Sequence, residues 1–221
     1  MKSLNSAMCG VLLLTALLWP PSNAGAQGPG QVKSNVSIPL GCGCTPQDEK
    51  DLNSRLKSIE AMIAEYKTLM PQYRASKQTL NEAIRDTIQG SVKVKLRAAR
   101  DPGARDFKAN TSDLTCHTTY QDGVTACLKG ALEDHEQVHR DACKSHKGTD
   151  WRFNQLAADY IQEEIDAYQK EYDRLQEEVN KLQAFCSLDP STRQILIETA
   201  AQQERETQAV KDLEFFTAHT D

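Results

Sequence analysis

The chain has 221 residues and a formal net charge of −5. A mildly acidic chain is poorly suited to binding nucleic acid or anionic lipid, so we expect neither as a partner. Its length is enough for one domain with a hydrophobic core of its own.

The first 26 residues have the layout of a secretory signal. Lys2 precedes an apolar run from Val11 to Trp19, and Ala24-Gly25-Ala26 forms a small-x-small cleavage site. The run is too short to span a bilayer, and no later stretch is apolar enough to do so. We therefore expect cleavage near Ala26, a periplasmic or extracellular mature chain, and no stable membrane insertion.

Six cysteines follow this predicted signal, and an even number in an exported chain usually forms disulfides. They are Cys42, Cys44, Cys116, Cys127, Cys143 and Cys186. The first two lie within residues 27–44, a segment rich in Gly, Pro, Ser and Asn without periodicity. This segment is predicted to be an extended leader before a single helix-rich domain over residues 45–221.

Two long helices are predicted from apolar residues at alternating spacings of four and three. The first begins at Thr45-Pro46, a typical helix start, and its apolar positions are Leu52, Leu56, Ile59, Ile63, Tyr66, Met70, Tyr73, Leu80 and Ile84. The second falls within about residues 151–186, with Ile161, Ile165, Tyr168, Tyr172, Leu175, Val179, Leu182 and Cys186. Packed antiparallel, the two helices would bring Cys186 close to Cys42 and Cys44.

Between the long helices the pattern predicts a small sheet. Apolar and basic residues alternate from Ser91 to Arg97, which is typical of a strand with one wet face. Residues 114–120 and 124–128 flank the turn signal Gln121-Asp122-Gly123 and predict a hairpin that would pair Cys116 with Cys127. A helix over about 130–147, ended by Gly148, and a last helix from 191 to about 216 complete the predicted elements.

The predicted helix over 130–147 carries the sequence His135-Glu136-Gln137-Val138-His139. Two histidines one turn apart leave the same face of a helix and can reach one metal ion. Zinc held by three protein ligands keeps a position open for water, lowers the pKa of that water, and needs a carboxylate to accept its proton. The motif therefore supplies two candidate ligands and, in Glu136, a candidate general base.

A third ligand is expected from the second long helix, because zinc in enzymes commonly binds a glutamate. Glu164 has Tyr160 and Tyr168 one turn away on either side, which indicates an inward direction. Glu163 is flanked by Asp159 and Asp166 and is predicted to face water. We therefore select Glu164 as the third candidate ligand.

Simpler interpretations of the same residues remain open. His135 and His139 can lie on a solvated helix face, and Glu164 can be a surface carboxylate in an ion pair. Cys143, one turn beyond His139, can bind the same metal, although a structural disulfide is the better expectation in an exported chain.

The motif followed by Glu164 resembles the gluzincin branch of the zincin metallopeptidases. This resemblance implies a zincin-like α+β core, His135, His139 and Glu164 as ligands of one zinc ion, and Glu136 as general base and acid in peptide hydrolysis. It also implies an edge strand that holds the substrate, for which Ser91 to Arg97 is the candidate. The residue that stabilises the oxyanion stays open among Tyr160, His146 and His117.

The sequence thus predicts an exported, disulfide-stabilised, mostly helical α+β protein that hydrolyses a peptide or protein substrate with one zinc ion. Two alternatives remain. One is a non-enzymatic secreted binding protein whose helical surface contacts a protein partner, with structural zinc or none. The other is a zinc amidase that acts on cell-wall peptides.

Overall fold

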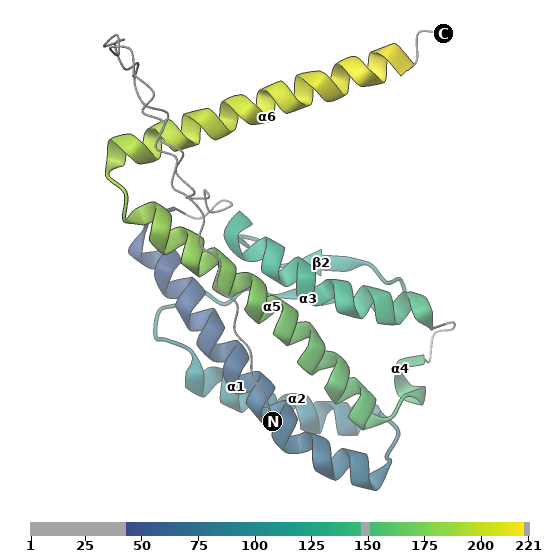
Figure 1. Cartoon of the computed structure of the whole chain (residues 1–221). Coiled ribbons are helices and arrows are strands. Elements are labelled where there is room, and N and C mark those ends of the chain that lie inside the picture. The colour runs from purple at the N-terminus through teal and green to yellow at the C-terminus, as the bar shows by residue number, and fades with distance from the viewer. Residues whose placement is uncertain (1–42, 147–150, 219–221) are drawn as a thin grey trace, which may run out of the picture. The chain divides into compact units, whose positions relative to one another are not determined.

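The computed structural model describes residues 43–146 and 151–218, which are mostly helical with one two-stranded sheet (Figure 1). This confirms a mostly helical chain with a small sheet. The predicted signal, Cys42, most of the leader and Gly148 lie outside the described residues. Of the helices in the described ranges, none combines the length and apolarity needed to cross a bilayer.

The two long helices are present and pack side by side (Figure 1). Helix α1 spans Pro46–Ser76 and helix α5 spans Ala157–Cys186. The Thr45 side chain accepts a hydrogen bond from the Asp48 backbone amide, so α1 begins where the sequence predicts. The first helix ends before Leu80 and Ile84, because Lys77 adopts the left-handed conformation at φ 51°. Leu80 is nevertheless buried in the core.

A disulfide at one end and two backbone hydrogen bonds at the other hold α1 and α5 antiparallel. A disulfide joins Cys44, before α1, to Cys186 at the end of α5. At the opposite end, the Leu80 amide donates to the Gln155 carbonyl at 2.9 Å and the Ala157 amide donates to the Gln78 carbonyl at 2.8 Å. The antiparallel arrangement therefore accounts for the predicted proximity of Cys186 to the cysteines near the leader.

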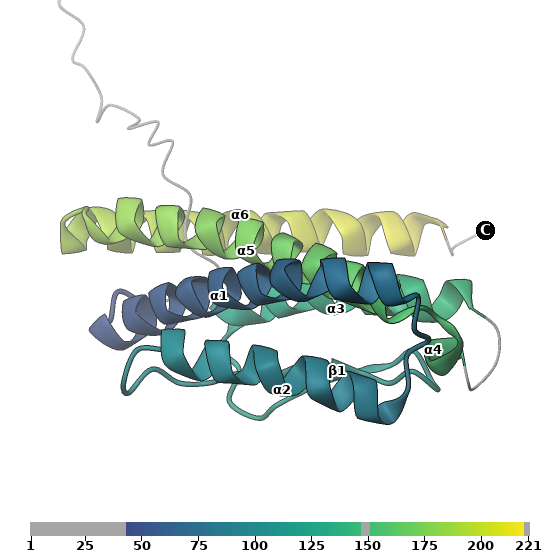
Figure 2. The same cartoon turned by 90° about the horizontal axis from the view of Figure 1, so that it is seen from below.

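The predicted strand from Ser91 to Arg97 is wrong, because these residues belong to helix α2, Glu82–Ala99. Figure 2 shows α2 lying along α1. Ile88 and Val92 are one turn apart and buried, whereas Val94, apolar in the alternating pattern, is 63% exposed. The helical spacing of Ile88 and Val92 therefore agrees with the structure, whereas the alternation of Val92, Val94 and Leu96 does not indicate a strand.

The hairpin is also placed differently from the prediction. Strand β1, Ala109–Thr111, pairs antiparallel with β2, Thr118–Tyr120. Residues 124 and 125 lead directly into helix α3, Ala126–Ser145, so no second strand forms there. The predicted bond between Cys116 and Cys127 is wrong: Cys116 is bonded to Cys143 of α3, and Cys127 is in another disulfide.

The remaining helices agree with the sequence apart from their ends. Helix α3 begins four residues earlier than predicted. The predicted helix over 151–186 is divided into α4, Trp151–Asn154, and α5. Helix α6 spans Pro190–Ala218, and the Asp189 side chain accepts a hydrogen bond from the Thr192 amide at its start. Helix α3 packs on α5 and on β1, which brings the motif helix against the helix that carries Glu164.

Candidate metal centre

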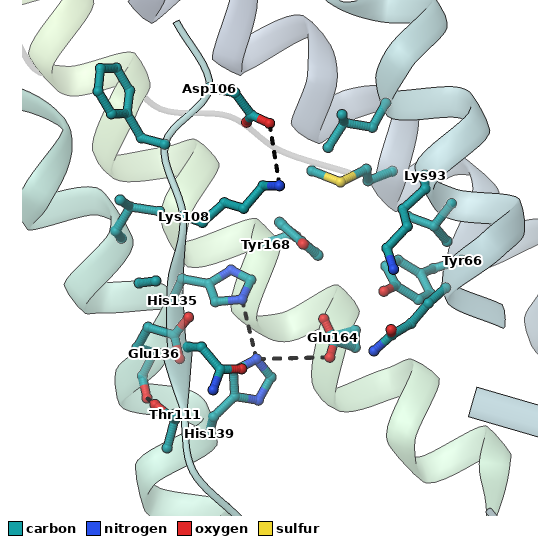
Figure 3. Close-up of a pocket in the computed structure, with 18 of the residues that line it drawn as sticks. Tyr66, Lys93, Asp106, Lys108, Thr111, His135, Glu136, His139, Glu164 and Tyr168 are labelled. Atoms are coloured by element: carbon teal, nitrogen blue, oxygen red, sulfur yellow. Dashed lines mark hydrogen bonds and ion pairs between the residues drawn. The ribbon is translucent and has the colours of Figure 1, made fainter. Parts of the chain in front are cut away.

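The two motif histidines point at each other from one face of α3. The Nε2 atoms of His135 and His139 are 3.2 Å apart, and both side chains are buried. Figure 3 shows both imidazoles at the edge of a cavity. The interpretation of these histidines as a solvated helix face is therefore wrong, because the exposed residues Glu133 and Asp134 occupy that face.

Glu164 of α5 completes a group of three. Its Oε1 atom is 3.9 Å from His139 Nε2, and the side chain is 12% exposed. One ligand atom from each of His135, His139 and Glu164 lies within 4.8 Å of the others, so these residues form a group that can hold a metal ion. The inward direction predicted for Glu164 is thus what the structure has.

The distances in this group are close to those of a tetrahedral metal site. Zinc to nitrogen bonds of 2.0–2.1 Å place two ligand atoms about 3.3 Å apart in tetrahedral geometry. The two histidine Nε2 atoms are already near that separation. Glu164 lies 3.9 Å from His139 Nε2 and within 4.8 Å of both histidines, so it must approach by about 0.5 to 1.5 Å.

Each histidine has a carboxylate behind it at the other ring nitrogen. His139 Nδ1 donates to Glu163 Oε1 at 2.7 Å. His135 Nδ1 is 3.1 Å from Glu171 Oε2, and neither of these two buried atoms has a hydrogen-bond partner among the described residues. Carboxylates in these positions orient histidine ligands and increase their basicity. Both rings are therefore held with Nε2 directed toward the shared site.

The prediction that Glu163 faces water is wrong. Its side chain is 12% exposed, and Arg152 Nη1 binds both carboxylate oxygens at 2.8 and 2.7 Å. Burial alone raises the pKa of Glu163, but the bonds from His139 and Arg152 outweigh burial and lower it. Burial likewise lowers the pKa of His139, whereas the hydrogen bond to Glu163 and the charge of Glu164 raise it overall. Glu163 thus accepts a hydrogen bond from His139 and orients its ring, and it does not face solvent.

Sequence reasoning missed Glu171 as well. It is fully buried and accepts a 2.6 Å hydrogen bond from Arg55 Nε of α1. Burial raises the pKa of Glu171, but the charges of Arg55 and His135 outweigh it and lower the pKa to about 2. A signal was available, because Glu164, Glu171 and Glu178 recur every seven residues in a helix with heptad spacing.

Glu136 lies beside the metal group without belonging to it. Its side chain is buried and lines the cavity, and its Oε2 atom has no hydrogen-bond partner. The Thr111 hydroxyl approaches the Glu136 carbonyl at 3.5 Å, which connects strand β1 to the motif helix. A buried carboxylate oxygen without a partner is costly, so a partner from outside the described protein atoms is expected.

The cavity has a volume of about 750 Å³ and is lined by residues of α1, α2, β1, α3, α4 and α5. Of the three oxyanion candidates, Tyr160 lines it, whereas His117 and His146 are exposed and do not. Tyr160 accepts a hydrogen bond from Gln89 at 3.1 Å. Burial first, and the nearby charge of Glu164 second, raise the pKa of Tyr160, so its phenol keeps its proton and can donate. Tyr66 and Tyr168 line the same cavity.

Cys143 takes no part in the metal group, because it is bonded to Cys116. The predicted structural disulfide at Cys143 is therefore confirmed, and the alternative of a cysteine ligand is wrong. Disulfides in the described residues suggest an oxidising environment.

Comparison with known proteins does not assign this chain to a family. No protein-family model, no curated protein and no solved structure matches the chain. The chemistry of the site therefore has to be argued from its own residues.

Proposed function

We propose that the protein is an exported zinc-dependent metallopeptidase with a gluzincin-like site. The observation that carries this proposal is the joint arrangement of His135, His139 and Glu164 around one point, with the unpartnered carboxylate of Glu136 beside them in the same cavity. The resemblance of the motif to the gluzincins is in line with that arrangement but does not by itself carry the proposal.

Two nitrogens and one carboxylate oxygen suit zinc better than calcium or magnesium, which prefer ligand sets made of oxygen. A zinc ion held there would polarise a carbonyl group and allow a water molecule to lose its proton near neutral pH. His135, His139 and Glu164 would hold the ion, and Glu163 and Glu171 would fix the two imidazoles.

In this scheme Glu136 accepts the proton of the attacking water. Its Oε2 atom is free to do so, because no described group donates to it. The same carboxyl then gives the proton to the leaving amine, so that the peptide bond breaks with no net change in Glu136. Tyr160 is the candidate donor to the developing oxyanion, since its protonated phenol lines the cavity.

In this proposal strand β1 holds the substrate, the role for which the gluzincin resemblance implied residues 91–97. The Ser112 amide donates to the His117 carbonyl and the Gln121 amide to the Lys108 carbonyl. By the alternation of an antiparallel ladder, the backbone groups of Ala109 and Thr111 point away from β2. Both residues line the cavity, so an extended peptide can add to this edge.

The experiment compares wild type with Glu136→Gln in a peptide-library cleavage assay with one equivalent of zinc. We expect the substitution to reduce hydrolysis about 10²- to 10⁴-fold, the usual contribution of a general base. Zinc content should not change, because Glu136 is not a ligand in this scheme. Glu133→Gln is the matched control, since Glu133 lies on the same helix and is exposed.

A non-enzymatic binding protein with structural zinc gives a different result. Wild type would then cleave no peptide at any zinc concentration, and Glu136→Gln would retain zinc, fold and partner binding. That outcome would reject the peptidase.

A further inference from the structure

The wall of the cavity across from the histidines is formed by a polar stripe of α2. Four residues at spacings of four line the cavity: Arg85, Gln89, Lys93 and Arg97. The stripe is fixed in this direction because Ile88 and Val92 of the same helix are buried in the core. Figure 3 shows Lys93 across the cavity from His135 and His139.

Several other cations of the cavity are paired with neighbouring carboxylates. Arg55 is paired with Glu171, and Arg152 is paired with Glu163 and Asp113. Arg100 and Lys108 share Asp106, at 3.5 and 3.7 Å. Arg55 and Arg152 therefore have little charge to offer a ligand, whereas Arg100 and Lys108 together keep the one positive charge that Asp106 does not offset.

The cations of the α2 stripe differ in this respect. Among the described residues, neither Lys93 nor Arg97 has an acidic side chain within 4.0 Å. Arg85 only stacks on the ring of Phe153, at 5.5 Å from the centroid. Arg85, Lys93 and Arg97 thus leave three positive charges uncompensated on one wall, in a chain whose net charge is −5.

The acidic groups of the cavity do not offset this stripe for an incoming ligand. Glu164 belongs to the metal group, and Glu136 lies beside it, so a divalent cation would neutralise both. The loaded cavity would then be positive on the α2 wall and close to neutral on the α3 and α5 wall. A field of this sign favours anionic ligands.

We propose that the cavity binds an acidic peptide in extended form, with its carboxylates directed at Lys93 and Arg97. This inference rests on the proposed function and names its substrate class. From Arg85 to Arg97 the stripe is about 18 Å long, which matches about five residues of extended chain. Strand β1 offers free backbone groups on the other side, and these select a peptide over other anions.

The test measures peptide binding separately from cleavage. A fluorescent peptide with Asp and Glu residues is titrated with zinc-loaded Glu136→Gln protein and followed by anisotropy, beside the same peptide with Asn and Gln. We expect the acidic peptide to bind about tenfold more tightly, with an advantage that shrinks as salt is added.

Two double variants locate the effect. Lys93→Gln with Arg97→Gln should reduce the affinity for the acidic peptide about tenfold, since each exposed ion pair contributes up to a few-fold. Lys67→Gln with Arg74→Gln is the matched control, because both residues are exposed on α1 and do not line the cavity. It changes the net charge equally and should leave the affinity within about twofold.

The outcomes separate this inference from the proposed function. Equal affinity for the two peptides, or equal losses in the two double variants, would overturn the acidic specificity even if the wild type cleaves peptides. Selective binding that depends on Lys93 and Arg97, together with a zinc-loaded wild type that cleaves neither peptide, would support the acidic ligand and reject the peptidase.

Discussion

Two buried glutamates seven residues apart on α5 have different surroundings. Glu171 pairs with Arg55 of α1 and contacts His135 of α3, so its partners come from two other helices. Glu178 is as fully buried, but its partners Arg174 and Lys181 belong to α5 itself and are 31% and 22% exposed. Burial of a carboxylate therefore does not by itself mark a site. The position of its partners is more informative, since of these two glutamates Glu171 is the one that connects α3 to α1.

The largest expected difference between these glutamates is in stability. Glu171→Gln should reduce the free energy of unfolding by about 3 kcal/mol, because it leaves Arg55, whose side chain is only 16% exposed, without its charged partner. Glu178→Gln should cost about 1 kcal/mol or less, because its partners reach solvent. Urea unfolding of the metal-free variants measures both. Equal losses would show that the two glutamates play the same part.

The pH dependence of stability sharpens the same contrast. The lowered pKa of Glu171 means that its charge stabilises the fold above its ordinary value of 4.5 and that this stabilisation is lost as pH falls toward about 2. Glu163 acts in the same direction, whereas the raised pKa of His139 stabilises at low pH and loses that contribution as pH rises through it. Metal-free wild type should thus lose about 3 kcal/mol between about pH 5 and pH 2 through Glu171.

The control for this pH series is Glu171→Gln, in which the slope should decrease by the contribution of Glu171. A Glu171→Gln protein whose stability falls with pH as steeply as that of wild type would contradict the assignment.

The smallest of these effects concerns Glu163, which supports His139 without touching the ligand site. Glu163→Gln should weaken zinc binding about 10- to 100-fold, the usual effect of losing a carboxylate behind a histidine ligand. Competition with a chromophoric chelator measures this affinity. Asp166→Asn serves as the control, because Asp166 is exposed on the same helix and bonds only to Gln162. Equal zinc affinities in the two variants would show that Glu163 does not contribute to zinc binding.

The sequence was most informative where its pattern was long. Nine apolar residues at heptad spacing predicted α1, although Leu80 and Ile84 belong beyond its end, and a similar run predicted α5. The antiparallel pairing of these helices correctly placed Cys186 near the start of α1. His135, His139 and Glu164 were selected because helical spacing alone puts two histidines on one face and Glu164 among apolar neighbours.

The misassigned elements are those where a short pattern had two interpretations. The alternation of Val92, Val94 and Leu96 lasts only five residues and also fits one turn of helix, and the spacing of Ile88 and Val92 favoured the helix. Glu163 was taken as solvent-facing because its sequence neighbours are acidic. Its actual partner, Arg152, comes from a separate short helix whose direction no local pattern specifies. Likewise, the pairing of Cys116 with Cys143 depends on how the hairpin packs against α3.

The most direct test of the metal centre is the zinc content of the oxidatively folded chain by elemental mass spectrometry. Wild type is compared with His139→Ala, Glu164→Ala and, as a control on α5, Glu178→Ala. We expect one zinc ion per chain in wild type and in Glu178→Ala, and less than a tenth of that in the other two variants. No zinc in wild type, or zinc retained in both His139→Ala and Glu164→Ala, would contradict the three-ligand site.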